Sequence, residues 1–79
     1  MTLEEMRKID EMFEKSMIER YGKHIPQIHL IFSIMLQAAY DGDLTYLSEH
    51  SQCFQAHCKL ALFEPVATAA YFEGLAIAP

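Results

Sequence analysis

Residues 26–40 read PQIHLIFSIMLQAAY, and this stretch decides the fold class. Apolar side chains cover most of the circumference of the helix it predicts, and only His29, Ser33 and Gln37, four residues apart, form a polar seam. A helix that is apolar on nearly all sides must be covered by neighbouring helices. Pro26 suits the first helical position, where its missing N–H is not needed. The stretch therefore predicts the most buried helix of an all-α domain.

The segment before this stretch predicts an amphipathic helix. Thr2 and Glu5 have the spacing of a capping box, and Gly22 suits the left-handed position that follows a helix. Apolar residues between them recur at steps of three and four: Met6, Ile9, Phe13 and Met17. We expect a first helix between Thr2 and Gly22, with charged side chains on its solvent-facing sides.

The segment after the stretch predicts a tight turn and a third helix. Asp41-Gly42-Asp43 favours an immediate chain reversal, with Asp43 capping a helix from Leu44 to about Phe63. Residues 38–47, AAYDGDLTYL, resemble the helix-turn-helix of an ankyrin repeat, although the Thr-Pro-Leu-His opening of that repeat is missing. This resemblance implies a helical hairpin.

Glu64-Pro65 ends the third predicted helix, because proline disfavours helical geometry in the residue before it. A shorter fourth helix follows from Pro65 to about Leu75. The expected fold is all-α: a single domain over residues 1–79, forming a small antiparallel helical bundle of three long helices plus a short C-terminal helix.

The composition suggests more apolar surface than the core of one small domain uses. Of the 79 residues, 52% are apolar before the three glycines are added. An average soluble domain has about 45–50% with glycine included, and a small domain should have less. Surplus apolar surface usually marks an interface. The alternative is a well-filled core rich in small alanines.

The charge limits the classes of partner. The net charge is −5, so nucleic acid and anionic membrane surfaces are poor partners. Residues 1–23 hold six acids and five bases, whereas residues 24–79 hold five acids and only Lys59 as a base. With two cysteines and no apolar run long enough to span a bilayer, we expect a reduced, cytoplasmic protein.

These features predict a small, acidic, non-enzymatic protein of regulatory or inhibitor type. It would act by protein–protein association through apolar helix surfaces, as a homodimer or bound to a larger partner. The second helix and the last fifteen residues carry the least charge, and we expect the partner-binding side chains there: Ile31, Phe32, Met35, Tyr71, Phe72 and Leu75.

A metal-binding function is the alternative. On the predicted third helix His50, Cys53 and His57 are spaced three and four residues apart, and imidazole and thiolate are preferred ligands of zinc and copper. The other interpretation is that these side chains flank the core without a metal. A Cys/His enzyme is disfavoured, because His57 and Cys58 are adjacent in sequence and do not face each other on a helix.

Overall fold

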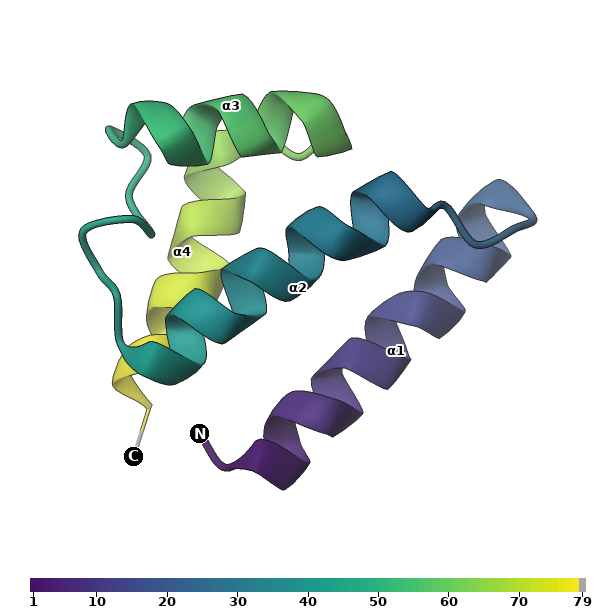
Figure 1. Ribbon diagram of the computed structural model, residues 1–79, viewed down its shortest axis with the longest axis horizontal. Helices are drawn as coiled ribbons and strands as arrows, with labels where there is room; N and C mark the ends of the chain where they lie inside the picture. The colour runs from purple at the N-terminus through teal and green to yellow at the C-terminus, as the bar shows by residue number, and fades with distance from the viewer. Residues whose placement is uncertain (79) are drawn as a thin grey trace.

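The computed structural model describes residues 1–78 and contains four α-helices in that range. They are α1 (Leu3–Tyr21), α2 (Pro26–Asp41), α3 (Gln52–Ala61) and α4 (Pro65–Ile77). The all-α prediction is confirmed. Figure 1 shows α2 crossing the middle of the molecule, with α1 running alongside it in the opposite direction, α3 at its other edge and α4 behind it.

The core is built around α2, the helix predicted to be most buried. Within residues 1–78, α2 packs against each of the other three helices, α3 also packs against α4, and α1 packs against no helix except α2. The buried residues of α2 are Ile28, Ile31, Phe32, Met35, Leu36 and Ala39. They meet the largest buried side chains of the later segments: Leu47, Phe54, Cys58 and Phe72.

The ends of α1 and the end of α2 are as the sequence predicts. The Thr2 hydroxyl accepts a hydrogen bond from the Glu5 backbone N–H, and the Glu5 carboxylate accepts one from the Thr2 N–H, which completes the capping box. Gly22 and Gly42 follow their helices with φ of 75° and 71°. These left-handed conformations favour glycine, which has no Cβ to clash with the backbone.

The predicted start of the third helix at Leu44 is wrong, and so is the helical hairpin implied by residues 38–47. Residues 43–51 form successive turns, and α3 begins only at Gln52, which makes it the shortest of the four helices. Short polar side chains in this segment bond nearby backbone N–H groups and so compete with helix formation. The Asp43 carboxylate accepts from the Tyr46 N–H, and the Ser51 hydroxyl caps α3 by accepting from the Phe54 N–H.

The turn between α3 and α4 contains an unusual backbone conformation. Leu62 follows α3 with φ 62° and ψ 34°, and it is the only non-glycine residue with positive φ in the described chain. Glu64 then caps α4 by accepting hydrogen bonds from the N–H groups of Val66 and Ala67. Among residues 1–78, no single helix is long and apolar enough to cross a membrane; α3 and α4 meet that test only together, as a pair bent by 110°.

Candidate functional site

Most of the side chains predicted to bind a partner lie in the core. Ile31, Phe32, Met35 and Phe72 are buried, and Leu75 is half-buried against the core. The prediction that they anchor a partner is corrected for these four, because the other helices already cover them. Of the predicted set, only Tyr71 is exposed.

The predicted metal ligands do not form a metal site. His50 lies in the turn segment before α3, and its side chain is 87% exposed beside Glu49. The Nδ1 atom of His57 lies 2.6 Å from the Tyr46 hydroxyl, and Cys53 is exposed. Within residues 1–78 no group of three or more His, Cys, Asp or Glu side chains is placed to hold a metal ion. The predicted third helix would have placed these ligands on one face, but α3 begins at Gln52 and does not include His50.

Tyr46 and His57 instead form a polar contact at the edge of the core. The Tyr46 ring packs edge-on against buried Phe54, while its hydroxyl meets His57. Burial raises the pKa of Tyr46 to about 12, and the nearby Cys53, Cys58 and Asp43 add to this rise. Burial also raises the pKa of the Cys58 thiol, so Cys58 is an unreactive core residue.

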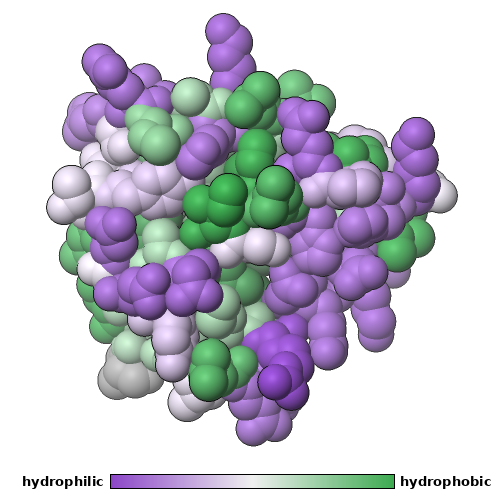
Figure 2. Space-filling model, viewed as in Figure 1, coloured by the Kyte–Doolittle hydropathy of each residue, from purple (hydrophilic) through white to green (hydrophobic). Residues whose placement is uncertain are grey.

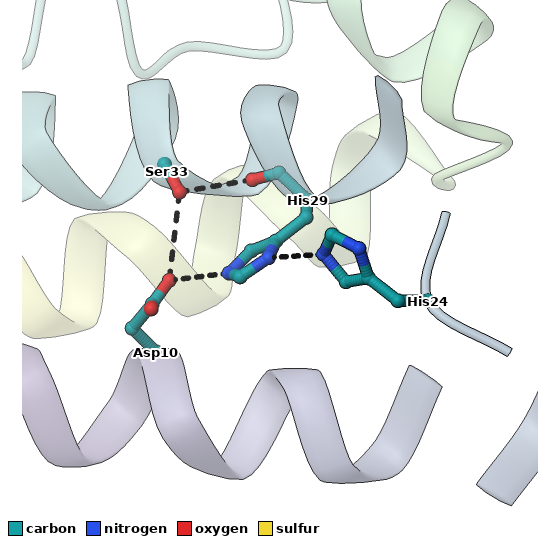
Figure 3. A network of polar contacts seen from close by, with 4 residues as sticks. All are labelled: Asp10, His24, His29 and Ser33. Carbon is teal, nitrogen blue, oxygen red and sulfur yellow. Dashed lines mark hydrogen bonds and ion pairs between the residues drawn. The ribbon is translucent and has the colours of Figure 1, made fainter. Parts of the chain in front are cut away.

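The most developed polar cluster joins α1, α2 and the loop between them (Figure 3). The Nε2 atom of His29 lies 2.8 Å from Asp10 Oδ1, and its Nδ1 atom lies 2.8 Å from His24 Nε2. The single proton of the Ser33 hydroxyl is shared between two acceptors, the His29 carbonyl oxygen at 2.9 Å and the same Asp10 oxygen at 3.4 Å. Asp10, His29 and Ser33 are partly buried, and His24 is exposed.

This cluster connects α1 to α2 through Asp10, His29 and Ser33, and we call it the clasp. It resembles part of a serine triad only in composition, because the Ser33 hydroxyl points to a carboxylate and a carbonyl instead of an imidazole nitrogen. It fixes α1 against α2 beside the stacked rings of Phe13 and Phe32, whose centroids are 3.8 Å apart. The polar seam of α2 indicated two of its members, but nothing in the sequence paired them with Asp10.

Large apolar side chains are exposed on all four helices, and four of them lie on the outer side of α2 and at the end of α3. Leu30 and Ile34 lie one turn apart on the outer side of α2 and are 63% and 39% exposed. Gln27 donates a hydrogen bond to the Leu60 carbonyl at 3.3 Å, which holds the end of α3 beside the first turn of α2. Leu60 and Leu62 are 57% and 79% exposed at that end. We call Leu30, Ile34, Leu60 and Leu62 the outer apolar surface.

Figure 2 shows that hydrophobic side chains gather on the face of the molecule over α2. A hydrophobic patch occupies the middle of the face, and the hydrophilic side chains of α1 lie to its right. Ile31, Phe32 and Met35, the α2 side chains expected to bind a partner, face the core, and the exposed apolar residues Leu30 and Ile34 lie on the opposite side of the helix. Periodicity alone does not tell which side of an almost wholly apolar helix is covered.

A second apolar feature is a cleft between α1 and α4, which both pack on α2. Phe13 and Phe32 lie at its centre, and Met12 and Tyr71 line it from α1 and α4. This is where exposed Tyr71 lies.

No protein-family model matches the chain, and no curated protein or solved structure shows significant similarity to it.

The clasp predicts a measurable coupling between Asp10 and His29. In a double-mutant cycle with Asp10→Ala and His29→Ala, urea unfolding should give a coupling of about 1 kcal/mol, the usual net contribution of a partly buried hydrogen bond. The matched control is the more exposed pair Glu49 and His50, whose side chains are 42% and 87% exposed and lie 3.5 Å apart; the same cycle should give a coupling near zero. Equal couplings in the two pairs would contradict the clasp.

The burial of Tyr46 predicts a loss of stability at high pH. Its folded-state pKa of about 12 exceeds the ordinary value of 10.0, so the unfolded chain releases this proton first as the pH rises. Its contribution is complete below pH 10 and is lost as the pH approaches 12. Alkaline titration of tyrosinate absorbance should show a late step that Tyr46→Phe removes. If Tyr46→Phe instead removes a tyrosinate step at lower pH, the late step does not belong to Tyr46.

Proposed function

We propose that this chain is a small, non-catalytic protein of regulatory or inhibitor type that acts by binding another protein chain through its outer apolar surface. The observation that carries the proposal is the combination of backbone conformation and side-chain exposure at Leu62. This residue has a left-handed backbone and is the most exposed large apolar side chain of the described chain.

Both properties of Leu62 are unfavourable in the isolated molecule. A left-handed conformation costs a residue with a Cβ about 1 kcal/mol, which glycine avoids. A buried leucine would offset this penalty by leaving water, but Leu62 is 79% exposed. Residues held in strained conformations cluster at functional sites. A partner that covers Leu62 supplies the compensation that the monomer lacks.

The surroundings of Leu62 support an interface. Leu60 lies on the adjacent turn of α3, and Leu30 and Ile34 extend the apolar surface along α2. Large exposed apolar residues that gather over neighbouring elements are typical of binding surfaces. Catalysis has less support, because the side chains of the Asp10–His29 clasp bond one another and the protein backbone.

Leucine-to-glycine substitutions test the strain directly. Leu62→Gly should raise the free energy of unfolding in urea by about 1 kcal/mol, because glycine accepts the left-handed conformation. The control is Leu60→Gly, the same change at an exposed helical leucine two residues earlier. This control should lower the free energy of unfolding by about 1 kcal/mol, because glycine disfavours the helix. If Leu62→Gly destabilises the chain as much as Leu60→Gly, Leu62 is not strained and the central observation fails.

Photo-crosslinking tests the binding itself. A photoreactive phenylalanine analogue at position 62, in cells that naturally make the protein, should give an adduct of discrete mass with another protein chain. The same analogue in place of Lys15, on the solvent-facing side of α1, should give none. Absence of an adduct at position 62, or equal adducts at both positions, would overturn the proposal.

A further inference from the structure

The outer side of α2 carries no formal charge until its last residue. Residues 24–40 contain no Asp, Glu, Lys or Arg, although the whole chain has a net charge of −5. The exposed positions Gln27, Leu30, Ile34 and Gln37 follow one another at steps of three and four and form one stripe, which Asp41 ends. Two copies of a chain with this net charge repel each other, and they approach with least repulsion where neither presents a charge.

We propose that a second copy of this chain binds the outer side of α2, with the two α2 helices antiparallel about a two-fold axis near Ile34. The proposal rests on the proposed function, since it names the partner of the outer apolar surface. A two-fold dimer uses the same patch on both copies, so a patch that binds itself must be free of like charges at its centre. The Leu30–Ile34 stripe meets that condition.

The charges at the two ends of α2 select the antiparallel direction. Ile34 lies seven residues after Gln27 and seven before Asp41, so an axis at Ile34 places each Asp41 opposite the partner's Gln27. The first turn of α2 has neither a side-chain cap nor an acidic residue. Its free N–H groups carry the partial positive charge of a helix N-terminus and attract a carboxylate. A parallel pair would instead bring two Asp41 carboxylates together.

The side chains along the stripe are arranged as in a small interface. Leu30 and Ile34 form an apolar centre, the amides of Gln27 and Gln37 form a polar rim, and Leu60 and Leu62 add apolar area at the α3 end. With so few apolar layers the contact belongs to the weak, concentration-dependent class. The dimer should therefore form and dissociate with protein concentration.

Cysteine crosslinking of the purified full chain tests the axis. In a Cys53→Ser background, which removes the exposed native thiol, Ile34→Cys places a thiol at the axis, opposite its own copy and within disulfide range. Mild oxidation should give a covalent dimer about tenfold faster than with Ile18→Cys, because association raises the local thiol concentration. Ile18 is a matched control: it is also an isoleucine, lies on α1, and is 44% exposed against 39% for Ile34.

The solution mass of the wild-type chain and of Leu30→Glu supplies a second readout. Light scattering should show the wild-type mass rising towards that of a dimer with concentration, while Leu30→Glu, altered at an exposed site, should remain a folded monomer. Equal crosslinking of the two cysteine variants, or a wild-type monomer at every concentration, would overturn the dimer.

The results also separate this inference from the proposed function. A monomer whose position 62 still crosslinks to a different protein ends the dimer and leaves the proposed function standing. If the chain is a monomer and position 62 gives no crosslink, both the dimer and the proposed function are wrong. Capture of an unidentified protein without self-association does not support the dimer.

Discussion

The structure depends on the packing of one uncharged helix against the other three. α2 supplies the largest share of the buried core, and among the described residues α1 packs against no other helix, although its Phe13 also meets Phe63 in the turn between α3 and α4. The hydrophobic effect drives this packing without directional bonds. The Asp10–His29 clasp and the Phe13–Phe32 stack then set the position of α1 along α2. With three neighbours on its inner side, α2 still has apolar residues on its outer side.

The same constraint links the fold to the proposed function. A helix that is apolar on nearly all sides needs neighbours all round it, and among the described residues α1, α3 and α4 cover only part of α2. Leu30 and Ile34 remain exposed for that reason, and the strained Leu62 extends the surface at the end of α3. In Figure 2 the hydrophilic side chains of α1 lie beside the hydrophobic patch over α2.

Much of the fold could be predicted from local sequence, and less of the candidate site. The capping box at Thr2, the glycines after α1 and α2, and Pro26 and Pro65 act through near neighbours, so their effects are readable in the sequence. The start of α3 was misjudged because Asp43 and Ser51 bond the backbone locally, in competition with a helix that the apolar spacing favours. The covered side of α2 and the pairing of Asp10 with His29 depend on tertiary packing, which periodicity does not encode.

Amide hydrogen exchange of the native chain tests the central role of α2 most directly. If α2 holds the other helices together, its amides at the buried core should exchange only through global unfolding, with the largest protection in the chain. The amides of α1, whose only helical neighbour among the described residues is α2, should exchange through a smaller opening that leaves α2, α3 and α4 folded. Amides of α2 that exchange faster than those of α3 and α4, or an α1 as protected as α2, would contradict the account.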